Sequence, residues 1–206
     1  DVDELDAVYR RTALHVAAER GAEEAAAALL ELGADVDATN GFRTLPLHTA
    51  VAAGRVEMAQ LLVEAGAYVS AWDEDNYTPL HLAVRSGSLD MLELLLRAGA
   101  YVNAEGGIGG TALHAAVLEG SASALKMLLS AGANVDAQEE FSYITPLHLA
   151  AEGGQLDALE LLLAAGADPT LEDVDGQTAA EVAAVHDHPE AHILLEAAEK
   201  RVGQCG

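Results

Sequence analysis

Apolar residues along this chain gather in pairs of short clusters, and the whole arrangement returns about every 33 residues. In the stretch from Thr78 to Val102, a first apolar cluster closes at Gly87, and a second runs from about Leu89 to Gly99. Apolar positions three and four residues apart indicate amphipathic helices, and a glycine commonly ends a helix in the left-handed conformation. The pattern therefore predicts two short helices in each repeat.

A similar tetrapeptide marks the start of the first helix in each repeat. Its five clear copies end in histidine, and a sixth copy is degraded: Thr12–His15, Leu45–His48, Thr78–His81, Thr111–His114, Thr145–His148 and Thr178–Glu181. Threonine is a good helix N-cap, and proline is favoured at the position that follows it. Leu45 stands at the threonine position in the second copy, so we expect that helix to lack a side-chain cap.

A period of 33 residues indicates stacked supersecondary units, because one short helix pair cannot bury its own apolar side. The tetrapeptides, the Gly-Ala pairs that close the second helices and the 33-residue register resemble the ankyrin repeat over nearly the whole chain. The resemblance implies an all-α solenoid of antiparallel helix pairs, with β-turn fingers between repeats. It predicts one domain over residues 1–206, with repeats at about 4–38, 39–71, 72–104, 105–137, 138–171 and 172–206. It also implies that the repeat histidines hydrogen-bond the turn and its threonine.

The aromatic residues fall outside the predicted helices. We call the segments 35–43, 68–77, 101–110, 134–144 and 168–177 the fingers. They hold seven of the eight aromatic residues, which are Phe42, Tyr68, Trp72, Tyr77, Tyr101, Phe141 and Tyr143, while Tyr9 lies in a partial finger at the start of the chain. Exposed aromatic residues commonly anchor interfaces, so we expect Trp72 to contact a partner, with one or more of Tyr77, Phe141 and Tyr143. Alternatively some rings pack against neighbouring fingers, above all Tyr68 and Tyr101, each of which directly follows a Gly-Ala pair. One extra residue within 138–144 predicts a bulge in that finger.

The fingers are also acidic. They carry thirteen Asp and Glu residues against one basic residue, Arg43, in a chain with 34 acidic and 10 basic residues and a formal net charge of −24. This charge repels nucleic acid and anionic membranes and favours a cationic partner with an apolar residue beside its charge. The acidity alternatively serves solubility alone. The predicted partner-binding residues are Phe42, Trp72, Asp73, Glu74, Asp75, Tyr77, Arg85, Ile108, Leu118, Glu139, Glu140, Phe141 and Tyr143. Of these, Arg85 and Leu118 line the inner-helix groove by the resemblance.

Other chemistry is weakly supported. His186, His188 and His192 form a candidate metal group at a helix junction, but without clean spacing, so a solvated cap is favoured. The glycine-rich segment 106–111 lacks the lysine of a phosphate loop, and we interpret it as a finger tip that offers Ile108 to a partner. Asn103 resembles the finger asparagine that hydroxylases modify in this family. We expect no cofactor and no catalytic residues.

These observations predict a non-enzymatic adaptor that binds a protein or peptide through its fingers and groove. The alternative is a structural scaffold or spacer in a larger protein, such as an enzyme or a channel. We expect a monomer, because nothing in the sequence specifies self-association. The single cysteine, Cys205, indicates a reducing compartment, so we place the protein in the cytoplasm or nucleus.

Overall fold

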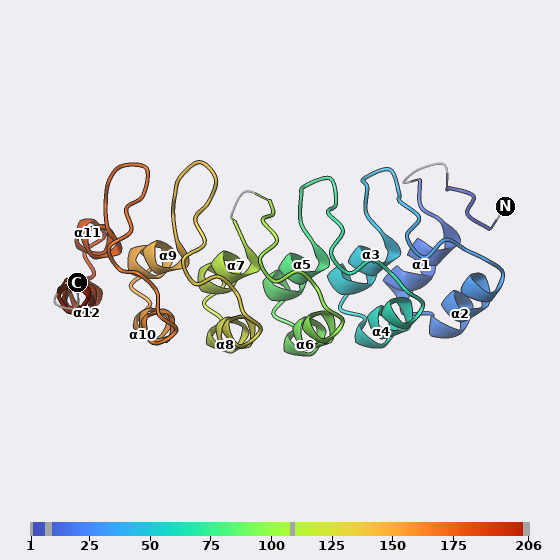
Figure 1. The fold of residues 1–206 in the computed structure, drawn as a ribbon. Helices are drawn as coiled ribbons and strands as arrows, with labels where there is room; N and C mark the ends of the chain where they lie inside the picture. Colours follow the sequence, from blue (N-terminus) through green and yellow to red (C-terminus); the bar gives the residue numbers. More distant parts are fainter. Residues whose placement is uncertain (1, 7–9, 108–109, 204–206) are drawn as a thin grey trace. The chain divides into compact units, whose positions relative to one another are not determined.

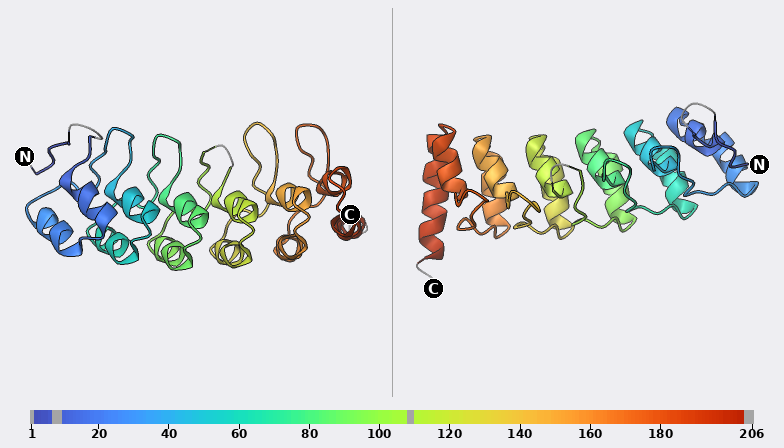
Figure 2. Two further views of the ribbon diagram at one scale, coloured as in Figure 1. Left: turned by 180° about the vertical axis from the view of Figure 1, so that it is seen from behind. Right: turned by 90° about the horizontal axis from the view of Figure 1, so that it is seen from above.

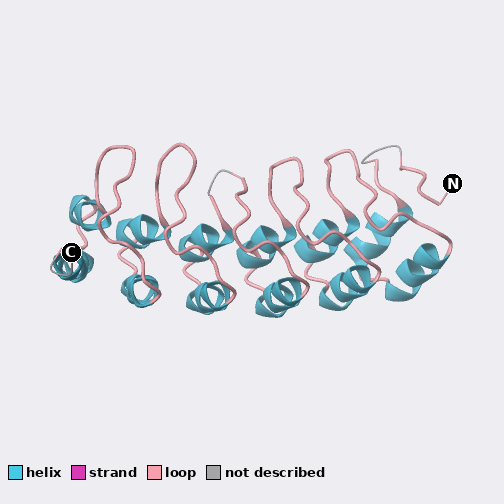
Figure 3. Ribbon diagram, in the orientation of Figure 1, coloured by secondary structure: helices cyan, strands magenta, loops and turns pink. Residues whose placement is uncertain are grey.

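The computed structural model describes residues 2–6, 10–107 and 110–203. These residues hold twelve helices, and their contacts divide the chain into two compact units, Asp1–Gly107 and Ile108–Gly206. The all-α prediction is confirmed. Figure 3 draws the connections between the helices as loops, and the described residues contain no strand, only isolated bridges such as the one from Glu172 to Thr178. That residues 1–206 behave as one domain stays a prediction.

The first unit contains three antiparallel helix pairs. The first helices of the pairs pack on one another and the second helices do the same, so the unit has two helical layers (Figure 1). The pairs are α1 (Ala13–Arg20) with α2 (Glu23–Glu31), α3 (Pro46–Ala52) with α4 (Val56–Glu64), and α5 (Pro79–Arg85) with α6 (Leu89–Arg97). The predicted bounds near Leu89 and Gly99 agree with α6.

The second unit repeats this plan. Its pairs are α7 (Ala112–Leu118) with α8 (Ala122–Ser130), α9 (Pro146–Glu152) with α10 (Leu156–Ala164), and α11 (Ala179–Val185) with α12 (Pro189–Val202). Within each unit the fingers rise beside the first helices, away from the second helices (Figures 1 and 2). The fingers are therefore the loops that project from the layer of first helices in each unit.

Leucine, methionine and alanine fill the space between the helix layers. Met58, Leu62, Met91 and Leu95 are fully buried in the first unit, while Ala50 and Ala83 let the first helices approach closely. Packed helix axes lie about 8–10 Å apart when the contact residues are small. This spacing sets the step from one finger to the next.

The first helices begin as the tetrapeptides predict. Thr145 has the extended backbone of an N-cap, and its hydroxyl accepts a hydrogen bond from the His148 backbone. In the degraded last copy the Glu181 carboxylate accepts the Thr178 backbone N–H at 2.9 Å, which completes a capping box. Leu45 makes no side-chain cap and is buried, so the expected gap in the second copy is confirmed.

Left-handed residues end the first helices. Gly21, Gly54, Gly87, Gly120 and Gly154 have φ between 60° and 70°, and Asp187 holds the same position in the last repeat with φ 61°. A non-glycine residue is strained in this conformation because its β-carbon crowds the backbone. The last repeat thus has aspartate in place of the usual glycine, and the turn geometry is nevertheless kept.

The residue after the left-handed position links neighbouring repeats in three places. Side-chain nitrogens of Arg55, Gln155 and His188 reach the backbone carbonyls of Glu19, Val117 and Glu152, at 3.3, 3.0 and 2.9 Å. These carbonyls lie in the last turn of the preceding first helices, where the usual donor four residues on is missing, although the Val117 carbonyl also accepts the Gly120 N–H at 2.9 Å. The contacts therefore satisfy exposed helix ends and join one repeat to the next.

Candidate partner-binding site

Three of the finger tips are tight turns held by an Asx side chain, at Asn40, Asp73 and Asp173. Asp73 Oδ1 accepts the backbone N–H groups of Asp75 and Tyr77 at 3.0 and 2.8 Å. Asn40 and Asp173 make the same pair of bonds in their own fingers. The turns place Arg43, Asn76, Tyr143 and Gly176 in the left-handed conformation. The tip geometry is thus set by the local sequence.

The finger that carries the extra residue has a wider tip. Its closing bond runs from Tyr143 N–H to Glu139 carbonyl, four residues back, at 3.1 Å. The other described tips close over three residues, as from Asn76 to Asp73. The predicted bulge within 138–144 is confirmed.

The repeat histidines tie the fingers to the helices. His15 Nδ1 accepts the Thr12 backbone N–H, and because a carbonyl can only accept, Nε2–H donates to the Thr44 carbonyl at 2.8 Å. His48, His114 and His148 reach carbonyls of the following segments in the same way. The ring is therefore neutral with its proton on Nε2. Burial lowers the pKa of His15 and of His48, against the opposing pull of the carbonyl that each ring touches.

Backbone hydrogen bonds join adjacent fingers edge to edge. Phe42 carbonyl accepts Glu74 N–H at 3.1 Å, Asn76 carbonyl accepts Gly107 N–H at 3.0 Å, and Ser142 carbonyl accepts Val174 N–H at 2.8 Å. The first two bonds lie in the first unit and the third in the second unit. Neighbouring fingers therefore form one supported surface in each unit.

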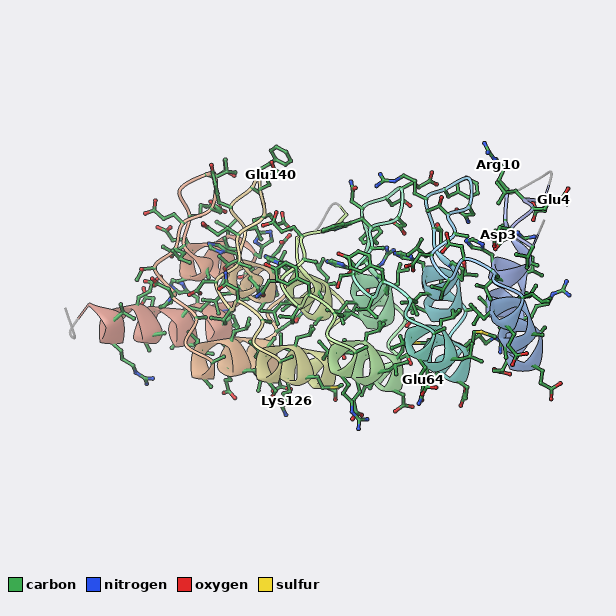
Figure 4. The ribbon with its side chains drawn as sticks, turned by 45° about the vertical axis from the view of Figure 1, so that its right-hand side comes forward. Asp3, Glu4, Arg10, Glu64, Lys126 and Glu140 are labelled. Carbon is green, nitrogen blue, oxygen red and sulfur yellow. The ribbon has the colours of Figure 1, made fainter. Side chains whose placement is uncertain are left out.

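The finger tips of the second unit bring apolar and acidic side chains together. Phe141 is 83% exposed, Val174 is 60% exposed and Tyr143 is 50% exposed. Glu140 and Asp175 are exposed beside them, and Figure 4 shows Glu140 at the tip of its finger. We call Glu140, Phe141, Tyr143, Val174 and Asp175 the acidic tip. Glu139 also flanks Phe141, but its carboxylate accepts the Ser142 hydroxyl at 2.6 Å and so supports the turn.

Val174 was missed by sequence reasoning, which followed aromatic residues only. It stands 33 residues after Phe141, between Asp173 and Asp175. That spacing would have identified Val174 as the tip residue of the next finger, because an apolar side chain between two acidic residues in a loop has no helix face to pack against.

The first unit carries a smaller version of this surface. Trp72 is 43% exposed, and its indole N–H donates to the Glu105 carbonyl at 3.0 Å, which holds the ring across two fingers. Phe42 is 45% exposed beside the finger that carries Glu74 and Asp75, both exposed. Asp73, in contrast, is used by the tip turn. Glu74 and Asp75 are therefore the exposed carboxylates of this finger.

Tyr77 is the least accessible of the predicted anchors. The Arg85 guanidinium lies 4.7 Å from its ring centre, and Gly107 lies so close to the ring that a β-carbon would overlap it. Gly106 similarly faces His81. These close approaches explain why positions 106 and 107 are glycine, because a β-carbon there would overlap His81 or Tyr77. Ile108 lies outside the described residues.

The inner helices offer few predicted contacts. Leu118 on α7 is 60% exposed, and Val185 on α11, at the equivalent position two repeats later, is 66% exposed. Arg85 on α5 is exposed but covers Tyr77. Leu118 and Val185 are thus two exposed apolar positions at the ends of first helices in the second unit, one of which was predicted to contact a partner.

The candidate metal residues serve the C-terminal repeat. His186 and His192 reach the carbonyls of Val182 and Ala180 at 3.0 and 2.9 Å, and His188 bridges to the preceding repeat. Within the described ranges, no group of three His, Cys, Asp or Glu side chains is placed to hold a metal ion. Asn103 is half-buried, and its hydroxylation stays a prediction. None of the described helices is long and apolar enough to span a bilayer.

Comparison with known proteins agrees with this architecture. A family model for ankyrin repeats (3 copies) matches residues 14–106, 73–139 and 113–203. The crystal structure of an ankyrin repeat domain from Acinetobacter baumannii AYE is 32% identical, with a TM-score of 0.83 over 90% of this chain and 96% of that chain. None of the curated proteins matches the chain. Ankyrin repeats generally mediate protein binding and are typically non-catalytic. This chain belongs to the ankyrin repeat family.

Proposed function

We propose that this protein is an adaptor that binds a protein or peptide segment in which a basic residue adjoins an apolar one. The observation that carries the proposal is the acidic tip of the second unit. Phe141 is 83% exposed there, next to Val174 and between carboxylates. A large apolar side chain held in water at the end of a supported loop is unfavourable for an isolated domain, and such residues are typical interface anchors.

The contact would combine two forces. Burying a phenylalanine side chain contributes about 1.5–3 kcal/mol, and a cation over its ring adds about 0.5–2 kcal/mol. The exposed carboxylates of Glu140 and Asp175 attract the cation and raise the rate of encounter. On the helix side of the same unit, Figure 4 shows Lys126 on α8, away from the labelled Glu140. The negative charge of the tips is therefore not neutralised by that lysine.

The first unit supports the same proposal with a second set of residues. Trp72 and Phe42 would provide apolar contact, and Glu74 and Asp75 would provide charge. Tyr77 and Arg85 would contact the partner only at their exposed edges, because they cover each other. In the second unit, Leu118 at the end of α7 would add an apolar contact. The net charge of −24 disfavours nucleic acid and anionic membranes as partners.

The test is partner capture with matched variants of the second unit. Phe141→Ala with Val174→Ala removes the apolar part of the acidic tip. Ile193→Ala on α12 is the control, because Ile193 is 67% exposed in the same unit but outside the fingers. We expect the tip variant to lose a basic partner from a matched lysate and the control to keep it. Equal capture by both variants would remove the acidic tip from the proposal.

A salt titration tests the charge separately. Raising sodium chloride from 50 to 500 mM is expected to weaken binding of the captured partner at least tenfold, because exposed charges are screened within about 10 Å at 0.1 M salt. Affinity that does not change with salt would show that the carboxylates serve solubility only.

A scaffold role is the second candidate, favoured by one observation. The open side of α1 and α2 forms an apolar groove of about 410 Å³, lined by Ala25, Ala28, Leu29 and Leu32 among others, with Arg20 the one charged lining residue. The equivalents of Ala25 and Leu29 in the next repeat, Met58 and Leu62, are fully buried. Light scattering separates the candidates, because a scaffold that assembles through this face would exceed the monomer mass.

A further inference from the structure

Among the described residues of the first unit, Tyr68 and Tyr101 are the most exposed aromatic side chains, at 55% and 60%. Each stands at the start of a finger, directly after a Gly-Ala pair, where the chain leaves the second helix of its repeat. The alternative that some rings pack against neighbouring fingers holds for Tyr77, which lies against Gly107, whereas Tyr68 and Tyr101 leave more than half of their surface exposed. They lie at the base of the fingers, four residues or more before the tip turns, and are distinct from the anchors discussed above.

The other repeats use this position for a turn. Their Asp or Asn side chain accepts the backbone N–H two residues on, at 2.9–3.2 Å, in the pairs Asp35 with Asp37, Asn134 with Asp136, and Asp168 with Thr170. A tyrosine cannot make this short Asx bond, although the backbone turn from Tyr101 to Ala104 is kept. The two tyrosines thus forgo a local bond and leave their rings largely in water. Neither feature helps the fold.

The two tyrosines are placed alike, one repeat apart. The backbone N–H of Tyr68 donates to Asp37 Oδ1 at 2.9 Å, and that of Tyr101 donates to Ser70 Oγ at 2.9 Å, in the same register. Asp35 holds the equivalent position one repeat before Tyr68, and its N–H donates to the Asp3 carboxylate at 3.2 Å. These three equivalent positions therefore carry a carboxylate at Asp35 followed by aromatic rings at Tyr68 and Tyr101.

We propose that Asp35, Tyr68 and Tyr101 form a docking row for an extended, proline-containing basic peptide. Stacked helix pairs advance about 8–10 Å per repeat, whereas three residues of a polyproline II helix advance about 9 Å. Prolines three residues apart therefore meet one tyrosine each, and a basic residue three positions further reaches the carboxylates of Asp35 and Asp37. Aromatic rings in a row are the usual surface for this peptide conformation.

The docking row goes beyond the proposed function, since it uses no residue of the finger tips. The first probe is a fluorescein-labelled peptide, Arg-Ala-Ala-Pro-Ala-Ala-Pro, and the second is its reversed sequence, because a polyproline II helix can dock in either direction. Two control peptides test the geometry and the charge: one has a fourth residue between the prolines, and one has Glu in place of Arg. Binding to the whole chain is measured by fluorescence anisotropy and by amide shifts in NMR.

The matched variant is Tyr68→Asp with Tyr101→Asp. It installs the residue that the other repeats carry, so the fold is expected to be kept or strengthened, as circular dichroism will report. We expect at least tenfold weaker binding of the first probe or its reverse, although the variant adds negative charge that by itself would attract the peptide. The paired Tyr→Phe changes keep the rings and should retain affinity within about threefold.

Three results would overturn the docking row. These are no binding of either probe at millimolar protein, unchanged affinity in the Tyr→Asp variant, or a control peptide that binds as tightly as the probe from which it is derived. The Phe141→Ala, Val174→Ala variant separates this proposal from the acidic tip. It should bind the probes normally while losing the captured basic partner, whereas the Tyr→Asp variant should do the opposite.

Discussion

Replacing Asp187 with glycine should stabilise the protein. Asp187 has φ 61°, at the position where the preceding five repeats have glycine with φ between 60° and 70°. The left-handed conformation costs a non-glycine residue about 1–2 kcal/mol, and aspartate sits at the low end because it tolerates this region. The added freedom of glycine in the unfolded chain returns about 0.4–1 kcal/mol. Removing a negative charge just after the C-terminus of α11 adds a few tenths of a kcal/mol, roughly.

The net expectation is a gain of about 0.5–1 kcal/mol, or a rise in Tm of about 2 °C for a chain of this length. Urea denaturation followed by circular dichroism measures it. The reciprocal change Gly120→Asp is the control within the same unit. Gly120 has φ 63°, and no atom lies within 4 Å of the place that a β-carbon would take, so the cost is backbone conformation and charge alone. The reasoning is refuted if Asp187→Gly lowers stability, or if Gly120→Asp does not.

Three further changes test the repeat contacts. Burial depresses the pKa of His48 in the folded state below its unfolded value of about 6.5. The neutral ring therefore contributes its whole stabilisation above pH 6.5, and this contribution is lost as the pH falls from there through the folded pKa. His48→Gln should therefore be less stable at pH 7.5 but lose less stability down to pH 5.5, as urea midpoints will show. Gln155→Ala removes the bond to the Val117 carbonyl and should cost about 1 kcal/mol in urea denaturation, with no cost refuting a link between repeats. Leu45→Thr restores a cap worth about 1 kcal/mol but empties buried apolar volume worth about 1.5–3 kcal/mol, so it should lower Tm.

The helices could be predicted closely because their determinants are local. The tetrapeptides give the first turn its N-cap, and the spacing of Gly87 and Gly99 sets the helix lengths. The degraded copy at Thr178 also forms its helix, with Glu181 in the histidine position. The final helix, α12, runs from Pro189 to Val202.

The candidate site was predicted only in part. Phe141 and Trp72 are exposed as expected, but Tyr77 is half-covered by Arg85 and Gly107, and Val174 was not foreseen. Exposure of a finger residue depends on the next finger, whose contacts are 30 or more residues away in the chain. Composition alone does not say which side of the loop that neighbour covers.

By itself the sequence determined the period, the helix pairs, the caps and the acidity of the fingers, because each follows from residues within one repeat. The tertiary structure alone decided which rings are free. Tyr68 and Tyr101 lie open at the finger bases, while Tyr77, in the same type of loop, is packed between Arg85 and the following finger. The physical reason is that stacking brings neighbouring fingers into contact over only part of each loop, and the chain's local pattern carries no record of which part.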